Sequence, residues 1–435
     1  MLMKIYELKE LSGRDVDKLC SRNPVYDEEL FSFCRQVFAQ VRDRGDEAVA
    51  EYTLKYDKVA LDDCRVSVEE FGEASEKVSD ELLSAMKLAA RNIKKFHSSQ
   101  KISTEPVEVQ EGVSCWRAAR AIRSVGLYVP GGTAVLPSSV LMLGIPAVLA
   151  GCSKVALTVP PLKDGTVSPA VLAAAKIAGV RQVFKIGGAQ AIAALSLGTE
   201  SVPRVDKILG PGNRIVQMAK LAATLEGTAI DMVAGPSEVL VIADQTADPE
   251  VIASDLLSQA EHDRDSQVVL VTTSRQLAER VEGALGRQIT ALPRKEIAEA
   301  AISQSFTVIT ETLEDAISFS NDYAPEHLIL LFENARESSS QVTSAGSVFV
   351  GRWTPEVAGD YASGTNHTLP TSGAARAFSG VSLDSYVKKL TFQEISVEGL
   401  ESLADPLRLL AREEELEGHA NAVTTRVELA GREGK

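Results

Sequence analysis

The chain has 435 residues, of which 45% are hydrophobic and 24% are charged, and its formal net charge is -15 at pH 7. This length corresponds to roughly three domain-sized units, and the balance of apolar and charged residues is that of a soluble globular protein. Because binding to nucleic acid or to an anionic membrane needs clustered lysine and arginine, the negative charge argues against both as partners.

The sequence also lacks the marks of export. No uninterrupted apolar stretch reaches the length of about 18 residues that a membrane span needs, and charges interrupt the first residues, where a secretory signal would be apolar. The five cysteines are scattered and form no C-x-x-C motif. This predicts a cytoplasmic protein without a disulfide framework or a thiolate zinc site.

Two kinds of element are predicted along the chain. Residues 25–100 carry apolar residues at helical spacing, which predicts a helical region. After it, short β-branched runs alternate with Ala- and Leu-rich stretches, the pattern of βαβ units and a parallel sheet. The predicted strands are residues 124–130, 154–160, 182–187, 205–210, 238–244, 267–273, 306–311, 327–332 and 347–351. A further strand is predicted near Tyr386, followed by a charged helix from Leu403 to Val423.

These elements predict an α/β fold with two Rossmann-like modules, incomplete because neither contains a G-x-G-x-x-G motif. We expect a helical N-terminal region (1–123) that packs on the second module, and a first module at 124–235. The second module is expected at 236–380, and a C-terminal strand and helix segment at 381–435.

Glycine-rich corners follow three strands of the first module, at residues 129–133, 186–191 and 209–214. In open α/β sheets, ligands bind beyond the carboxyl ends of the strands, often at helix N-termini. The corners therefore either cradle a phosphate or a dinucleotide or only form tight turns between strand and helix. Their spacing does not decide between the two.

Two histidines lie close in sequence to other possible metal ligands. Gln259 and His262 are three residues apart near the end of a predicted helix, so both can face one ion; the alternative is a solvated helix end. Asp360 and His367 lie in a long segment rich in Gly, Ser and Thr. Such a segment is more often a functional loop than a flexible surface loop.

A third group lies near the C-terminus, where Glu414, Glu415 and His419 share a predicted helix. An ion pair on the helix surface is the simpler interpretation of this group. Together the three groups offer imidazole, carboxylate and amide ligands, which suit a zinc ion. A set with fewer imidazoles and more oxygens would suit manganese or magnesium.

Glu326 and His327 stand side by side after a proline and before an apolar run. Adjacent residues of a regular strand point to opposite faces, but the chain after Ala-Pro need not be regular. If both side chains reach one cavity, they provide two proton-transfer groups of different pKa. The alternative is an exposed strand start, where neither side chain has a function.

Several stretches, taken in order, resemble the histidinol dehydrogenase family over nearly the whole chain. They are F-H-S-S-Q (96–100), G-L-Y-V-P-G-G-T-A (126–134), P-S-S-V-L-M (137–142), G-G-A-Q-A-I-A-A-L (187–195), G-P-G-N (210–213), I-D-M-V-A-G-P-S-E-V-L-V-I-A-D (230–244), Q-A-E-H-D (259–263), A-P-E-H-L (324–328), G-D-Y-A-S-G-T-N-H-T-L-P-T (359–371) and E-G-H-A-N-A-V (417–423).

This resemblance implies the last step of histidine biosynthesis, a two-step NAD-linked oxidation of L-histidinol through L-histidinaldehyde to L-histidine. It implies one Zn²⁺ ion per site, bound by Gln259, His262, Asp360 and His419. The implied substrate contacts are Ser237, Gln259, His262, His327, Asp360, Glu414 and His419. The implied NAD⁺ contacts are Tyr128, Gln190 and Asn213, one in each glycine-rich corner.

The resemblance also implies roles. His327 would be the general base for the alcohol and for the hydrated aldehyde, and Glu326 would activate the water that adds to the aldehyde. His367 would lie behind a ligand or face the substrate. The family forms an intertwined homodimer, so Glu414 and His419 would complete the site of the partner subunit.

Two other classes of function remain open. A zinc-dependent hydrolase of C–N bonds could use the same ligands, with Glu326 and His327 activating water, and would need no nucleotide. A non-catalytic scaffold that binds a nucleotide or a metal would tolerate replacement of both residues.

Overall fold

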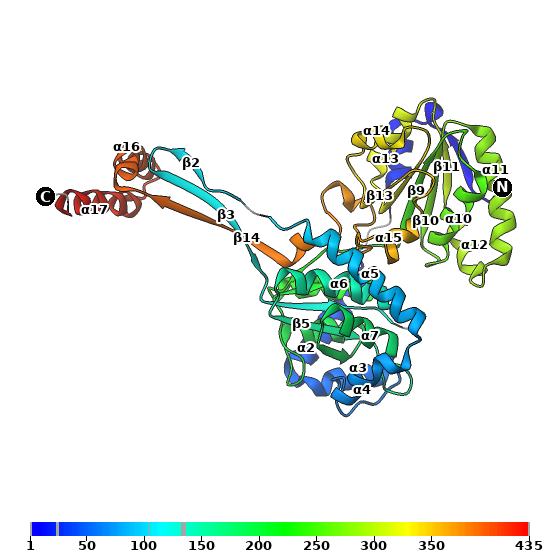
Figure 1. The fold of residues 1–435 in the computed structure, drawn as a ribbon, viewed down its shortest axis with the longest axis horizontal. Coiled ribbons are helices and arrows are strands. Elements are labelled where there is room, and N and C mark those ends of the chain that lie inside the picture. The colour runs from blue at the N-terminus through cyan, green and yellow to red at the C-terminus, as the bar shows by residue number, and fades with distance from the viewer. Residues whose placement is uncertain (1, 23–25, 103, 132–135, 434–435) are drawn as a thin grey trace. The chain divides into compact units, whose positions relative to one another are not determined.

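The computed structural model describes residues 2–22, 26–102, 104–131 and 136–433, which divide into two compact units (Figure 1). The first unit contains the chain up to Gln100 together with Ile122–Tyr386. The second unit contains Lys101–Ala121 and the chain from Val387 onward. Gly132 and Thr133 of the first glycine-rich corner lie outside the described residues.

A five-stranded parallel sheet forms one half of the first unit. Its strand order is β6-β5-β4-β7-β8, with β4 Ser124–Tyr128, β5 Lys154–Val159, β6 Gln182–Lys185, β7 Lys207–Leu209 and β8 Ala229–Ile230. The chain passes outward from β4 to β6 and then returns to place β7 on the other side of β4. The strand order therefore reverses between β4 and β7.

A six-stranded parallel sheet forms the other half. Its order is β1-β11-β10-β9-β12-β13, with β1 Lys4–Glu7, β9 Glu238–Ala243, β10 Gln267–Thr272, β11 Phe306–Ile309, β12 His327–Leu331 and β13 Ser347–Val350. Here the order reverses between β9 and β12. Each of the nine strands predicted between residues 124 and 351 is present and ends somewhat earlier than predicted.

Helices cover both faces of each sheet, because successive strand residues point to opposite sides. In β9, Val239 and Val241 join one core while Leu240 and Ile242 join another. The helices that follow are α10 Pro249–Ala260, α11 Arg275–Gln288, α12 Lys295–Ser303, α13 Leu313–Tyr323, α14 Ala335–Ser338 and α15 Glu356–Tyr361.

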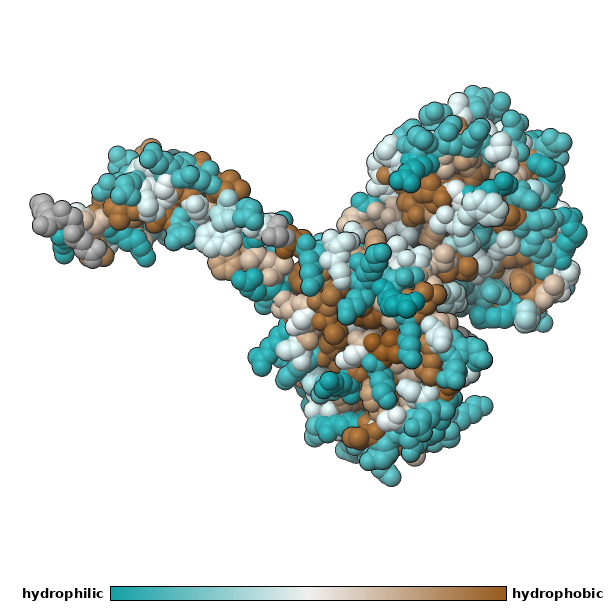
Figure 2. Space-filling view, viewed as in Figure 1, coloured by the Kyte–Doolittle hydropathy of each residue, from teal (hydrophilic) through white to brown (hydrophobic). Residues whose placement is uncertain are grey.

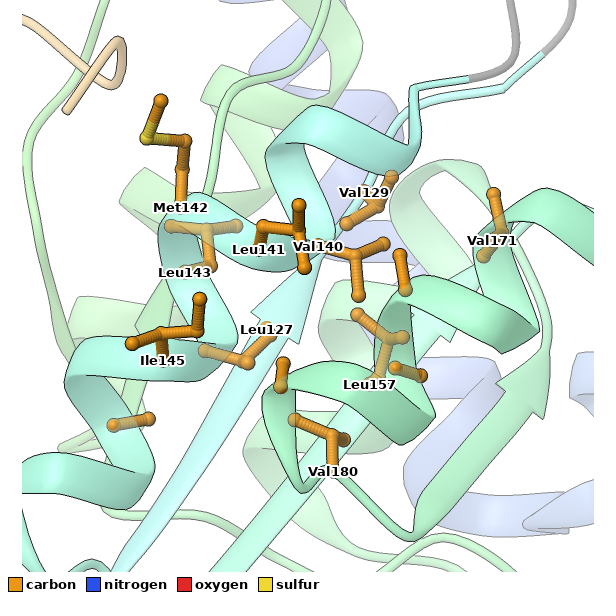
Figure 3. Packing of buried hydrophobic residues seen from close by; sticks show 14 of the residues in the cluster. Leu127, Val129, Val140, Leu141, Met142, Leu143, Ile145, Leu157, Val171 and Val180 are labelled. Atoms are coloured by element: carbon orange, nitrogen blue, oxygen red, sulfur yellow. The ribbon is translucent and has the colours of Figure 1, made fainter. Parts of the chain in front are cut away.

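The five-stranded sheet has the same arrangement, with its helices α6 Pro137–Ala150, α7 Pro169–Ala178, α8 Gly188–Leu197 and α9 Arg214–Leu225. Leu127 of β4 and Leu157 of β5 share a core with Val140 and Leu143 of α6 (Figure 3).

The N-terminal region differs from the prediction that it packs on the second module. Its helices are α1 Gly13–Cys20, α2 Glu28–Arg44, α3 Asp46–Tyr56, α4 Val68–Glu73 and α5 Asp80–Ser98. Val37 and Val41 of α2 and Ala48 of α3 bury their side chains in the core of the five-stranded sheet, and Ile93 of α5 does so on its other face. Among the described residues of this region, β1, the turn that follows it and α1 join the six-stranded sheet, where β1 pairs with the otherwise open edge of β11.

The second unit is a three-stranded antiparallel sheet with two helices (Figure 1). Its order is β14-β3-β2, with β2 Val107–Gln110, β3 Val113–Ala121 and β14 Val387–Ile395. Two helices, α16 Val397–Glu413 and α17 Glu417–Glu433, replace the single C-terminal helix that the sequence predicts. The helical conformation is interrupted between them at Glu415, whose φ is +58°. The hairpin of β2 and β3 was not predicted.

All five cysteines are free, as predicted. Among the described residues, every helix is too short or too polar to cross a lipid bilayer.

Candidate active site

The site forms at the amino edge of the six-stranded sheet, where β9 and β12 begin. Glu238 is the first residue of β9 and His327 the first residue of β12. The main-chain N–H of Glu238 donates to Oε2 of Glu326 at 2.9 Å. Nδ1 of His327 lies 2.9 Å from the carbonyl oxygen of Glu238, so Nδ1 carries the hydrogen and donates. One residue thus holds both members of the predicted pair.

Glu326 and His327 reach the same site although they are adjacent in sequence. Regular alternation begins only with His327, since Glu326 precedes the strand and follows Ala324, whose φ is +53°. Oε2 of Glu326 and Nδ1 of His327 are 3.6 Å apart, and both side chains are buried. Of the two alternatives that the sequence left open, the structure therefore has the two side chains in one buried cluster and not at an exposed strand start.

Two further carboxylates come from α15. Glu356 and Asp360 are four residues apart and share a helix face. Oε1 of Glu356 lies 3.7 Å from Nδ1 of His327, and Oδ1 of Asp360 lies 3.7 Å from Nε2. Among the described residues, this Nε2 is a buried polar atom without a hydrogen-bond partner. Ligand atoms of His327, Glu356 and Asp360 lie within 4.8 Å of one another, close enough to hold one metal ion.

Burial and mutual charge shift the pKa values of this cluster. Burial raises the pKa of Glu326 and of Glu356 to about 8 in each case. Burial alone would lower the pKa of His327, but the surrounding carboxylates outweigh it and raise the pKa to about 10. Burial would likewise raise the pKa of Asp360, but its interaction with His327 lowers it. Three carboxylates around one imidazole form an environment that attracts a further cation.

Gln259 and His262 border the cluster, at the end of α10. The Gln259 amide, turned so that both its ends are satisfied, donates to Glu356 and accepts from the N–H of Glu238 at 3.2 Å. His262 is exposed, and the charges of Asp360 and His327 act on its ring. Gln259 therefore contacts the cluster directly, and His262, in the turn after α10, lies near enough to Asp360 and His327 for their charges to act on it.

The sequence predicts that Asp360 lies in a loop, and this is wrong. Its segment forms the short helix α15 after Pro355. His367 lies behind it. Nδ1 of His367 is 3.0 Å from the carbonyl oxygen of Asp360, and Nε2 is 3.0 Å from Oγ of Ser139. Both ring nitrogens are thus occupied, and His367 supports the end of α15.

Other predicted residues lie elsewhere. Ser237 is half-buried beside Glu238. Tyr128 and Gln190 are buried at the carboxyl edge of the five-stranded sheet, where the Tyr128 hydroxyl accepts from the N–H of Gly188 at 3.2 Å. Asn213 caps α9 through the N–H of Val216. Glu414 and His419 are exposed residues of the second unit.

Sequence reasoning missed Glu238 and Glu356, which are 2% and 1% exposed. The four-residue spacing of Glu356 and Asp360 was a usable signal, since it places both carboxylates on one helix face. Glu238 gave no such signal, because its contribution to the cluster comes from main-chain groups.

The parallel sheets with helices on both faces and the buried cluster of acids and an imidazole are typical of an α/β enzyme. Residues 20–427 match the family described as histidinol dehydrogenase. A histidinol dehydrogenase of Bacteroides thetaiotaomicron is 51% identical over 426 residues, which cover 98% of this chain and 99% of that protein. One from Escherichia coli is 51% identical over 402 residues, 92% of each chain.

A solved structure agrees with the sequence comparison. The crystal structure of histidinol dehydrogenase from Elizabethkingia anophelis superposes with a TM-score of 0.96 at 48% identity and covers 99% of both chains. The chain therefore belongs to the histidinol dehydrogenase family, whose members are NAD-dependent oxidoreductases.

Proposed function

We propose that this chain oxidises L-histidinol through L-histidinaldehyde to L-histidine, with Zn²⁺ and NAD⁺ as cofactors. The observation that carries the proposal is the convergence of Glu326 and His327 on Glu238, with Nε2 of His327 left without a partner beside Asp360. An alcohol oxidation needs one base, and oxidation of the aldehyde to the acid needs a second group that handles the protons of water.

His327 and Glu326 divide the proton transfers between them. The hydrogen bond from Nδ1 to Glu238 leaves Nε2 as the ring nitrogen that can lose and regain a proton. A cation bound beside it would oppose the carboxylates that raise the pKa of His327, so that the neutral ring takes the proton of the alcohol and later that of the hydrated aldehyde. Glu326 takes a proton from the water that adds to the aldehyde. NAD⁺, when bound, accepts the hydride at each oxidation.

The residues near the cluster fit a zinc ion, since they combine nitrogen and oxygen donors with buried carboxylates of raised pKa. Gln259, His262 and Asp360 would hold it, and His419 from a second copy of the chain would complete the set. Bound zinc would hold the substrate in position beside the acid–base pair. A competing set is His327, Glu356 and Asp360, which lie close enough to bind an ion themselves.

Zinc content separates the two sets. We expect His262→Asn to weaken zinc binding by more than about 100-fold. Loss of a ligand should weaken binding at least as much as loss of a residue that hydrogen-bonds to a ligand. Glu356→Gln should keep its zinc, since the amide keeps the size of the carboxylate. The measurement is zinc per chain after gel filtration. Loss of zinc in Glu356→Gln with retention in His262→Asn would favour the competing set.

We place NAD⁺ on the five-stranded, Rossmann-like sheet, where the order reverses between β4 and β7. Ligands of open α/β sheets bind at such a point. Helices α6 and α8 begin there without a side-chain cap. Pro137 has no N–H and the N–H of Gly188 already donates to Tyr128, so the later N–H groups of the two first turns are the ones that can meet a pyrophosphate. Asn213 is exposed for direct contact, while the buried Tyr128 and Gln190 would form the floor of the site.

The corresponding point of the six-stranded sheet is poorly suited to a dinucleotide. A cavity of about 330 Å³ lies there, lined in part by Asp248, Glu333 and Arg352. The carboxylate of Asp248 already caps α10, and a second carboxylate on the cavity wall would repel a pyrophosphate. The difference between the two sheets supports a single NAD⁺ site in the first.

We propose that the second unit binds a second copy of the chain. Exposed apolar side chains gather on it (Figure 2), among them Leu409 and Leu410, which are 70% and 63% exposed, and Val107 and Val109, which are 61% and 60% exposed. Apolar surface of this kind marks a protein interface. In a homodimer, Glu414 and His419 could then reach the partner's substrate and zinc.

The decisive experiment is NADH formation from L-histidinol by the purified protein, with and without a zinc chelator. We expect two NADH per histidinol, lost with the chelator and restored by zinc. Release of ammonia without nucleotide would favour the hydrolase. Binding of zinc and NAD⁺ without any turnover would favour the scaffold.

A further inference from the structure

Arg22 is joined to the start of β9 by a buried ion pair. Its Nε and Nη2 donate to Oε1 and Oε2 of Glu238 at 3.0 and 3.1 Å. The two side chains are only 9% and 3% exposed. This two-bond pairing of a guanidinium with a carboxylate fixes both distance and orientation.

The surroundings fix the guanidinium as well. Its Cζ lies 3.4 Å from the centre of the Tyr323 ring, and Nη1 donates to the carbonyl oxygen of Cys20 at 2.5 Å. The N–H of Ser372 also donates to Oε1 of Glu238, at 3.0 Å. The Glu238 carboxylate therefore accepts three hydrogen bonds from groups far apart in the sequence.

The main chain of Glu238 in turn holds the acid–base pair. Its N–H binds the Glu326 carboxylate, and its carbonyl oxygen binds Nδ1 of His327, each at 2.9 Å. A shift of Glu238 would move both groups together and would change which ring nitrogen of His327 is free. The hydrogen bonds between Glu238 and the acid–base pair thus come from its backbone, and the charge of its side chain also acts on the Glu326 carboxylate.

We propose that Arg22 is a positioning residue: it fixes Glu238, which orients Glu326 and His327. This inference rests on the proposed function, because it assumes that these two residues carry the proton transfers. A buried ion pair contributes little net stability compared with apolar residues of similar volume, since desolvation offsets the attraction. Orientation of the pair is the effect that an apolar replacement could not reproduce.

The test compares Arg22→Met, Arg22→Lys and Arg287→Met in the full-length, zinc-loaded protein. We expect kcat per zinc-loaded site to fall about 10- to 100-fold in Arg22→Met, because displacement of reacting groups by about 1 Å has effects of that size. Arg22→Lys should be intermediate, since lysine keeps the charge and loses the two-bond geometry. Zinc content and the KM for NAD⁺ should stay within about twofold in both variants.

Arg287→Met is the matched control, because Arg287 pairs with Glu250 on the exposed surface of the same half of the first unit, the half that contains the six-stranded sheet. It should keep the kcat of the unsubstituted protein. If Arg22→Met gives no folded protein, Arg22→Lys and Glu238→Gln, which keep the buried volume, provide the same comparison. A kinetic isotope effect with substrate deuterated at the carbinol carbon should increase in the Arg22 variants, because hydride transfer would then limit the rate more strongly.

Two results would overturn the inference. One is an unchanged kcat per site in the Arg22 variants, with only a lower unfolding temperature or yield. The other is a change confined to zinc content or to the KM for NAD⁺. His327→Asn, assayed in parallel, separates failure of the positioning role from failure of the proposed function. Activity that is lost in His327→Asn but kept in the Arg22 variants contradicts only the positioning role. Activity that is kept in His327→Asn contradicts the proposed roles of Glu326 and His327.

Discussion

His327→Asn is expected to lower kcat by about 10²- to 10⁴-fold, the usual contribution of a positioned general base. The asparagine amide can still donate to the carbonyl oxygen of Glu238, as Nδ1 does now. It offers no basic nitrogen in place of Nε2, which faces Asp360 at 3.7 Å. The substitution therefore removes the proton acceptor and keeps the contact that orders the start of β12.

Steady-state NADH formation from L-histidinol, with zinc content and NAD⁺ affinity measured on the same sample, checks this expectation. Glu326→Gln provides the contrast, since it should keep the first oxidation and slow the second, so that one NADH forms per histidinol in the first turnover. Retention of most of the turnover by His327→Asn, with zinc bound, would contradict the assignment of this residue as the base.

The sheets could be predicted from the sequence because burial on both faces requires continuous apolar runs. V-L-V-I-A in β9 is such a run, and its residues alternate between two cores. The convergence of Glu326 and His327 was one of two alternatives that the sequence left open, since the chain after Ala-Pro need not alternate regularly. The structure decides between them because Glu326 precedes the regular strand.

The packing partners of the N-terminal helices could not be predicted in this way. An apolar helix face shows that the helix packs on a core but not which sheet supplies that core. The region 1–123 was therefore predicted to pack on the second module, whereas its residues Val37 and Val41 lie in the core of the five-stranded sheet. The hairpin of β2 and β3 was missed for a related reason. Its first strand, Val107–Gln110, is exposed throughout and therefore lacks a buried face that would give a pattern.

The site was predicted only in part. Residues that act through side chains, such as Gln259 and Asp360, stood out by chemical type and spacing. Glu238 acts through its N–H and carbonyl groups, which every residue has, and Arg22 reaches it across more than two hundred positions of the sequence. Such a link exists only after the strands have come together.

A second buried ion pair holds the corner that we assign to NAD⁺. Lys220 of α9 and Asp231 form it, and each side chain is 1% exposed. Nζ of Lys220 donates to the carbonyl oxygen of Gly210 at 3.0 Å, and Oδ2 of Asp231 accepts from the N–H of Gly210 at 2.8 Å. Gly210 has a φ of +129°, and a Cβ there would lie 2.1 Å from the carbonyl oxygen of Tyr128. The pair thus fixes the turn at Gly210, after β7, against the end of β4, where the strand order reverses.

Lys220→Met is accordingly expected to lower the free energy of unfolding of the half that contains the five-stranded sheet by about 3–5 kcal/mol. This is the usual effect of leaving one partner of a buried pair without its counter-charge. The double variant Lys220→Met/Asp231→Asn should recover part of the loss, because it removes the buried charge and keeps an acceptor for the N–H of Gly210. Urea denaturation at one fixed protein concentration measures both. A single variant as stable as the unsubstituted protein would mean that water reaches Asp231 and that the pair is not isolated from solvent.

The same variants indicate whether the pair matters beyond stability. Loss of the bonds to Gly210 frees the 210–213 corner, so NAD⁺ should bind more weakly to Lys220→Met even below the temperature at which this half unfolds. Zinc binding at the amino edge of β9 should not change, since the bonds that Lys220 and Asp231 make to each other and to Gly210 involve none of the predicted zinc ligands. Weaker NAD⁺ binding with unchanged zinc content would therefore link the corner to the nucleotide, independently of turnover.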